Sequence, residues 1–250
     1  AFDPELLAAW AAYPQQLQWI ETDTRQLPDL NGDAIILGAA ITASPEESQL
    51  TPEAHYRANL LPTLHALEWA QSVGVRRIIA VSSSAVYSAT DGAISEAQPP
   101  TPQGLYAAAK SAIEALIATL HAEHNRDACV IRLSNIYGLN EISRSTRPRV
   151  SLVARLVEQA LTERTMHPPN EPARDWTFAP DVGAALLALL QTERFPHALY
   201  NVAAEQRFTP QEIAQTIQQL VPEAAVQPTK ETPLTPTRRG YLSSERLRHD

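Results

Sequence analysis

The chain has 250 residues, 44% hydrophobic and 19% charged, so it can bury a substantial core, and this composition excludes a disordered or coiled-coil protein. Its net charge of −8 argues against a protein that binds nucleic acid, because such proteins usually carry a basic excess. A single cysteine, Cys129, excludes an intramolecular disulfide and any multi-cysteine metal site, and we expect no bound metal.

Apolar runs of strand length alternate with helical patterns through the first half of the chain. They predict helices at residues 4–12, 52–73 and 103–123, and strands at residues 17–22, 33–40, 76–82 and 128–134. This alternation is typical of an α/β protein whose parallel sheet is covered by helices on both faces. Because such sheets bind ligands at the carboxyl ends of their strands, we expect the site near residues 38–42, 82–88 and 134–140.

The second half of the chain is less regular. Its patterns predict helices at residues 147–165, 180–192 and 209–220, and one further strand at residues 198–203. Thr209 is expected to cap the last of these helices, with Pro210 at its first position.

No stretch of the sequence approaches the roughly 18–20 apolar residues that a membrane span requires. The start of the sequence also lacks the basic and then apolar pattern of a signal peptide. We therefore expect a cytoplasmic protein that does not engage a membrane.

The strongest chemical signal is the pair Tyr106 and Lys110, which follows the serines Ser82, Ser83 and Ser84 at a predicted strand end. A tyrosine and a lysine four apart on a helix lie on one face, one turn apart. A lysine ammonium favours the phenolate, so it lowers the tyrosine pKa and lets the tyrosine exchange a proton with an alcohol. The other interpretation is a surface helix with a solvated lysine.

Together with other segments, this motif resembles the extended short-chain dehydrogenase/reductases, the NAD-dependent epimerase/dehydratase family. The matching segments, in chain order, are Thr22-Asp23, residues 33–40, Asn59, residues 82–87, Glu96, Tyr106 with Lys110, residues 132–138 and residues 174–182. The resemblance runs from about residue 17 to the end of the sequence.

The resemblance implies a role for each matched position. Tyr106 would be the general acid/base, Lys110 would bind the nicotinamide ribose and tune Tyr106, and Ser83 would hold the substrate oxygen. The cofactor, NAD or NADP, would also contact Asp23, Thr24, Ala39, Ala40, Asn59 and Ser134. The substrate, commonly a nucleotide sugar in this family, would contact Ser84, Asn135 and Arg174.

Several positions depart from the family pattern. Ser84 and Ala85 stand where the sugar 4,6-dehydratases of this family carry an acidic pair, so we do not expect dehydration. Ala85 also replaces the cysteine of the GDP-fucose synthase type. Ser88 and Leu139 replace a usual glycine and a usual proline.

The largest departure concerns glycine, of which the chain has only 8 residues. None forms the G-x-G-x-x-G turn that cradles a pyrophosphate at a helix N-terminus. We therefore expect the sequence to be an incomplete representation of a longer protein, in which the first βαβ unit of the family pattern is not represented. The other interpretation is a protein that has lost its cofactor-phosphate site. NAD and NADP are not distinguished, because the discriminating residue would lie at the end of the second strand.

Arginines are concentrated after the predicted strand that ends near Asn135. They are Arg144, Arg147, Arg149, Arg155 and Arg174. Arginine suits the forked recognition of phosphate, so these residues fit a phosphorylated or nucleotide-linked substrate as well as they fit a solvated loop. Arg174 is the best candidate, because it matches a family position that contacts the substrate diphosphate.

The expected fold is α/β: a Rossmann-like, doubly wound parallel sheet, apparently without its first βαβ unit, and a smaller C-terminal substrate-binding region. Residues 1–138 would form the NAD(P)-binding region and residues 139–250 the substrate-binding region, with about 174–203 returning to the Rossmann core.

The expected function is NAD(P)-dependent epimerase or dehydrogenase chemistry on a secondary alcohol of a sugar or nucleotide sugar. The alternatives are an NAD(P)H-dependent reductase of a non-sugar carbonyl and a non-catalytic dinucleotide sensor. The resemblance further suggests a homodimer that pairs through the helix at 103–123.

Overall fold

The computed structural model describes residues 18, 20, 22–88, 91–124, 126–144, 146–229 and 240–250. Its main sheet contains four parallel strands in the order β1-β2-β4-β8. These strands are β1 (Ala34–Leu37), β2 (Arg77–Ser83), β4 (Asp127–Leu133) and β8 (Leu199–Val202). Their connections are helical crossovers, as parallel neighbours require. The predicted α/β class with a parallel sheet is confirmed.

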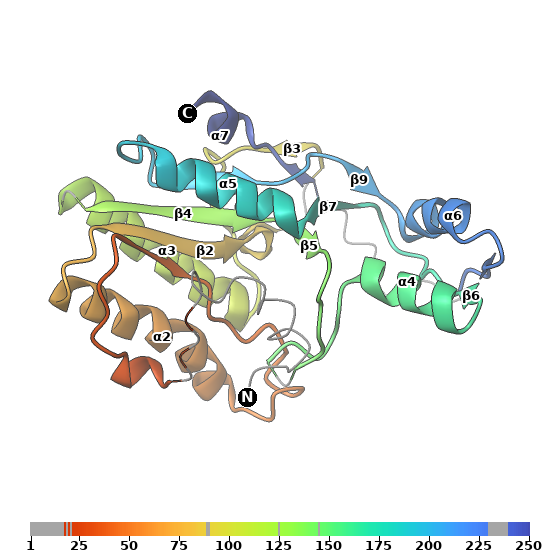
Figure 1. The fold of residues 1–250 in the computed structure, drawn as a ribbon, viewed down its shortest axis with the longest axis horizontal. Helices are drawn as coiled ribbons and strands as arrows, with labels where there is room; N and C mark the ends of the chain where they lie inside the picture. The colour runs from red at the N-terminus through yellow and green to blue at the C-terminus, as the bar shows by residue number, and fades with distance from the viewer. Residues whose placement is uncertain are drawn as a thin grey trace.

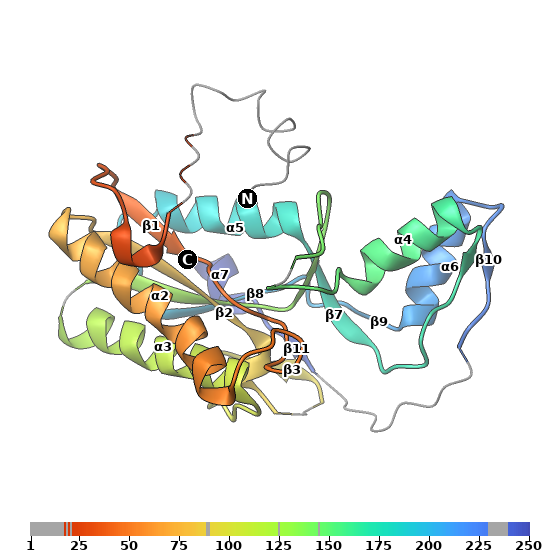
Figure 2. The ribbon, with the colours of Figure 1, turned by 90° about the horizontal axis from the view of Figure 1, so that it is seen from below.

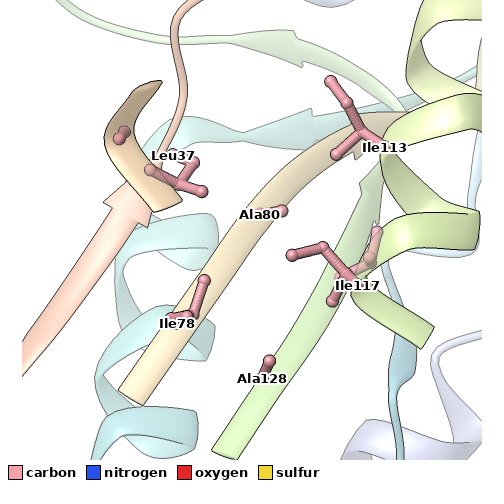
Figure 3. Packing of buried hydrophobic residues seen from close by; sticks show 8 residues of the cluster. Leu37, Ile78, Ala80, Ile113, Ile117 and Ala128 are labelled. Carbon is pink, nitrogen blue, oxygen red and sulfur yellow. The ribbon is translucent and has the colours of Figure 1, made fainter. Parts of the chain in front are cut away.

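Helices cover both faces of this sheet, and Figure 1 shows α5 (Ala179–Gln191) on the side opposite α2 (Pro52–Ser72) and α3 (Leu105–Glu123). Successive strand residues point to opposite faces. Ile78 and Ala80 therefore pack under α2 and α3, as Figure 3 shows, while Ile79 belongs to the cluster under α5. Cys129 lies in that second cluster and is fully buried.

A smaller region extends beyond the carboxyl ends of the strands, and Figure 2 shows its helices α4 and α6 set apart from the main sheet. Its elements are β5 (Asn135–Tyr137), α4 (Leu152–Thr162), β6 (Thr165–Met166), β7 (Arg174–Phe178), β9 (Arg207–Phe208), α6 (Pro210–Leu220) and β10 (Ala225–Val226). A core that includes Leu156, Met166 and Ile217 joins α4 to α6. Thr209 caps α6 through a reciprocal capping box with Glu212, as the sequence indicates.

Short elements complete the described fold. They are the 3₁₀ turns η1 (Thr24–Gln26) and η2 (Ser84–Val86), the strand pair β3 (Ala93–Ile94) and β11 (Tyr241–Leu242), and the last helix α7 (Glu245–His249). No helix in the described ranges is long and apolar enough to cross a membrane. The expected boundary at residue 138, between the NAD(P)-binding region and the substrate-binding region, stays a prediction.

Two sequence expectations differ from the structure. Of the strand expected at 17–22 only residues 18, 20 and 22 are described, and these three lie outside any strand; η1 follows at Thr24. The helix expected over 147–165 begins only at Leu152, because Pro148 interrupts the pattern and Ser151 caps the helix through the Ala154 N–H. The described residues between β5 and α4, 138–144 and 146–151, instead lie outside any helix and line the cleft at the carboxyl ends of the strands. The helix expected at 4–12 lies outside the described residues.

Candidate active site

A cleft of about 910 Å³ opens at the carboxyl ends of β1, β2 and β4. Residues from several separate segments line it, including Gly38, Ala40, Ser83, Tyr106, Lys110, Ser134, Asn135, Arg144 and Arg147. The structure thus brings together the predicted catalytic residues, Ala40 and Ser134 of the predicted cofactor set, and Asn135 of the predicted substrate set. This is the edge of the sheet where parallel folds bind ligands.

Tyr106 and Lys110 occupy the first turns of α3, on the face that meets the end of β2. The Lys110 side chain is almost completely buried, with 2% of the residue exposed, and its Nζ donates to the Val81 carbonyl at 2.8 Å. The same nitrogen lies 5.8 Å from the centroid of the Tyr106 ring. The lysine is therefore fixed by the backbone of β2 and presented to the cleft beside the phenol.

The protonation of these two residues follows from their burial. Burial lowers the pKa of Lys110 to about 8, although the charge of Glu114 opposes the shift. Burial raises the pKa of Tyr106, against the effects of a hydrogen bond with Ser83 and the charge of Arg147. At neutral pH the site thus presents an ammonium and a neutral phenol. The sequence argument expected a lowered tyrosine pKa; desolvation of the phenolate outweighs the neighbouring cations here.

Ser134 and Asn135 are oriented by the neighbouring strand β7. Ser134 Oγ lies 2.7 Å from Thr177 Oγ1, and Thr177 Oγ1 in turn accepts the Ala204 N–H at 2.9 Å. Asn135 Nδ2 donates to the Asp175 carbonyl at 2.9 Å. Both cleft side chains are therefore held in place before any ligand arrives.

Ser84 faces a different space from Ser83. It lines a small cavity of about 20 Å³ together with Tyr87, Ser134, Asn135 and Asp175. Asp175 is buried, and burial raises its pKa to about 6 while a bond from the Leu242 N–H at 3.2 Å opposes the shift. Sequence reasoning missed this carboxylate; its position directly after Arg174, in a strand, was the available signal.

Arg174 lines a neighbouring pocket of about 180 Å³, which also shares Asn135 with the cleft. Arg149 and Arg155 contribute to the same pocket. Arg174 is paired with Glu171 at 3.1 Å and Arg149 with Glu47 at 2.6 Å. The Trp176 Nε1–H in this pocket is buried without a hydrogen-bond partner among the described residues. The pocket therefore presents cationic groups next to the cleft.

The remaining predicted residues lie outside the cleft lining. Asp23 caps η1 and pairs with Arg25 at 2.6 Å, and Thr24 Oγ1 lies 3.4 Å from His65 Nδ1. Ala39 is exposed in the loop that follows β1. Asn59 is completely buried and bonds both backbone groups of Ile41, so here it shapes the loop. Their assignment to the cofactor stays a prediction.

The described residues fit one half of a dinucleotide. Lys110, Tyr106 and Ser134 converge on the cleft with polar groups that suit a nicotinamide riboside. The described part of the chain has no glycine-rich turn leading into a helix N-terminus, so it offers no pyrophosphate cradle of that type. Gly38 is the one glycine in the cleft lining, and a Cβ added to it would meet no atom within 4 Å.

Comparison with known proteins matches most of the chain to one protein family and to several of its relatives. The model of the NAD dependent epimerase/dehydratase family matches residues 17–203. UDP-glucuronic acid decarboxylase 6 of Arabidopsis thaliana is 25% identical over 247 residues, which cover 93% of this chain and 68% of that protein. UDP-glucose 4-epimerase of Streptomyces lividans is 26% identical over 196 residues, which cover 74% of this chain and 60% of that protein.

Solved structures share the fold. The ADP-L-glycero-D-manno-heptose-6-epimerase of Helicobacter pylori matches with a TM-score of 0.78 at 20% identity, over 92% of this chain and 72% of that one. A dTDP-glucose 4,6-dehydratase double mutant from Streptomyces venezuelae, with NAD and DAU bound, also gives 0.78, at 21% identity, over 100% of this chain and 78% of that one.

Proposed function

The chain belongs to the NAD dependent epimerase/dehydratase family, and we propose that it acts in nicotinamide-dependent hydride transfer at a secondary alcohol of a sugar or nucleotide sugar. The observation that carries the proposal is the convergence of Ser83, Tyr106 and Lys110 on one cleft at the carboxyl ends of the strands. NAD, when bound, supplies the acceptor for the hydride and can return it.

The residues of the chain handle the proton and the substrate oxygen. Ser83 is placed to hold the oxygen of the reacting alcohol, since it lines the same cleft as Tyr106 and Lys110. Tyr106 exchanges the proton: its phenolate takes the proton of the alcohol, and its phenol returns one to the ketone. Because burial raises the Tyr106 pKa, the resting form is the proton donor that ketone reduction needs. Lys110 would hold the nicotinamide ribose.

The substrate class follows from the second pocket. Asn135, Val150, Leu152 and Trp176 line both this pocket and the cleft, so one extended molecule can occupy the two spaces. A sugar beside Tyr106 would then place a linked diphosphate among the arginines of the second pocket, where guanidinium groups recognise phosphate well. The names of the relatives, which act on UDP-linked sugars, support this substrate class.

An epimerase is favoured over a simple reductase on the relatives' names, and both use the same residues. The decisive experiment incubates the full-length protein with NAD and a panel of UDP- and dTDP-sugars, then follows nicotinamide absorbance and sugar configuration. Net absorbance change indicates a dehydrogenase or reductase; a new epimer without net change indicates an epimerase. We expect Tyr106→Phe to abolish turnover and to retain cofactor affinity.

Undiminished turnover by the Tyr106→Phe variant would overturn the catalytic assignment. Tight NAD binding by the parent protein, with no turnover of any alcohol or sugar, would favour the dinucleotide sensor instead.

We propose further that the chain forms a homodimer through α2 and α3. Leu64, Leu67, Leu116 and Leu120 of these helices line a groove of about 200 Å³, together with Glu68, Gln71 and Arg126, and this partly apolar groove supports the proposal. Sedimentation of the purified protein tests this assembly. The cytoplasmic location stays a prediction, which fractionation of cells tests.

A further inference from the structure

A buried ion pair lies directly behind the candidate active site. The Arg132 guanidinium donates to both carboxylate oxygens of Glu114, through Nε at 2.9 Å and Nη2 at 2.5 Å. Ser82 Oγ donates to the same carboxylate at 2.5 Å, and Arg132 Nη1 donates to the Tyr87 hydroxyl. All four residues are buried. The carboxylate therefore accepts three hydrogen bonds from two different strands.

The sheet register creates this arrangement. Ser82 of β2 is paired with Arg132 of β4, and paired residues of adjacent strands point to the same face. Ile78 and Ala80 show that this face is the one covered by α3. Glu114 lies one turn beyond Lys110, which lies one turn beyond Tyr106, so one helical stripe carries all three.

Two consecutive residues of β2 bond this stripe, and a third lines the cleft beside it. The Val81 carbonyl accepts from Lys110 Nζ and the Ser82 hydroxyl donates to Glu114, while Ser83 lines the cleft together with Tyr106. Ser82, which bonds Glu114, thus lies between Val81, which bonds Lys110, and Ser83, which lines the cleft. It anchors the strand end to the helix by a charged hydrogen bond, and such bonds are about twice as strong as neutral ones.

Stability alone does not explain the pair. Two charges lose their hydration on burial, and an apolar pair of similar volume is often equally stable. What an apolar pair cannot supply is a negative charge beside the buried Lys110 ammonium and a hydrogen-bond acceptor for Ser82.

We propose that Glu114, held by Arg132, is a positioning residue of the active site, which fixes Ser83 against Tyr106 through Ser82 and keeps the buried Lys110 in its ammonium form. The catalytic consequence rests on the proposed function; the effect on the Lys110 charge does not. The charged and titratable groups that face this region are Glu114 and Tyr106 on α3, Arg132 on β4, Tyr87 after η2, Glu96 beside Tyr87, and Arg147 in the cleft lining.

The test measures the titration of Lys110 directly. The chain has two lysines, Lys110 and Lys230, so ¹³Cε-lysine labelling gives two side-chain NMR signals, which Lys230→Arg assigns. In Glu114→Gln we expect the Lys110 midpoint to move to lower pH, because the amide removes the charge that favours the ammonium. We also expect kcat with NAD and sugar to fall more than tenfold while KM changes less.

The matched control is another ion pair of β4, which joins this strand to β2. Arg77 Nε lies 2.6 Å from Asp127 Oδ2 at the opposite ends of β2 and β4, away from the cleft. Asp127→Asn should destabilise the protein and leave the Lys110 midpoint unchanged.

A double variant, Glu114→Leu with Arg132→Met, covers the case in which Glu114→Gln does not fold. We expect it to melt above Glu114→Gln and to retain the lowered Lys110 midpoint. A midpoint equal to that of the parent in either variant, or parental kcat in the double variant, would overturn the proposal. If the parent turns over no sugar, the proposed function fails, while the NMR midpoint still decides the role of Glu114 toward Lys110.

Discussion

Asn59 is predicted to contact the cofactor, but its hydrogen bonds in the structure are made to the protein backbone, so its role in stability can be tested. It is completely buried on α2, where its Oδ1 accepts the Ile41 N–H at 2.8 Å and its Nδ2 donates to the Ile41 carbonyl at 3.2 Å. These two bonds hold the loop after β1, whose residues Gly38, Ala40 and Thr42 line the cleft. Asn59→Ala removes both bonds, together with the bond from Nδ2 to the His55 carbonyl within the same helix, and leaves the loop backbone without its partner.

The size of the expected destabilisation follows from the two hydrogen bonds lost to Ile41. A typical intramolecular hydrogen bond contributes about 1 kcal/mol net, so Asn59→Ala should lower the free energy of unfolding by about 2 kcal/mol. For a chain of this size that loss corresponds to a drop in Tm of roughly 4–8 °C. The loss should be present without any cofactor, because the bonds are made within the chain.

The assay is urea unfolding of the cofactor-free protein, followed by circular dichroism. Ser72→Ala is the matched control, since Ser72 is an exposed polar residue of the same helix that bonds only its own helix, at the Trp69 carbonyl. We expect the control to change the unfolding free energy by less than about 0.5 kcal/mol. An Asn59→Ala variant as stable as the control, with weakened NAD binding, would refute the reasoning and restore a direct cofactor role.

Two further predictions concern pH and substrate affinity. The Lys110 pKa is about 8 in the folded protein, against an ordinary value of 10.5. Between pH 8 and pH 10.5 the unfolded chain therefore binds more protons than the folded protein does. In this pH range Lys110 makes the free energy of unfolding rise with pH. Lys110→Met should flatten that rise in unfolding experiments across the window, and an unchanged slope would contradict the assigned pKa. Arg174→Ala should raise KM for diphosphate-linked sugars about tenfold with little effect on kcat, because the contact of Arg174 with the diphosphate would lie away from the reacting carbon. A variant whose KM for UDP-sugars equals that of the parent would contradict diphosphate binding in this pocket.

The sequence determined the features that depend on local patterns. Apolar runs of strand length between helical patterns located the four strands of the main sheet, because a strand buried on both faces reads as a continuous apolar run. The spacing of Tyr106 and Lys110 placed them on one helical face, since residues four apart are neighbours on any helix. The cap at Thr209 was also readable, because a capping box involves only residues three apart.

The errors arose where a local pattern lacked its tertiary partner. The pattern at 17–22 predicted a strand, and its described residues, 18, 20 and 22, lie outside any strand, which forms only where another supplies its hydrogen bonds. The direction of the Tyr106 pKa shift was also wrong, because burial, which the spacing of Tyr106 and Lys110 does not reveal, outweighs the neighbouring cations.

Only the tertiary structure decided what surrounds the catalytic stripe. Glu114 is separated by 32 residues from Ser82 and by 18 from Arg132, and nothing local relates the three. The parallel register of β2 and β4 sets the serine beside the arginine, and the packing of α3 on that face brings the carboxylate to both. A sequence specifies which residues can ionise; the register and the packing decide which of those charges are buried together.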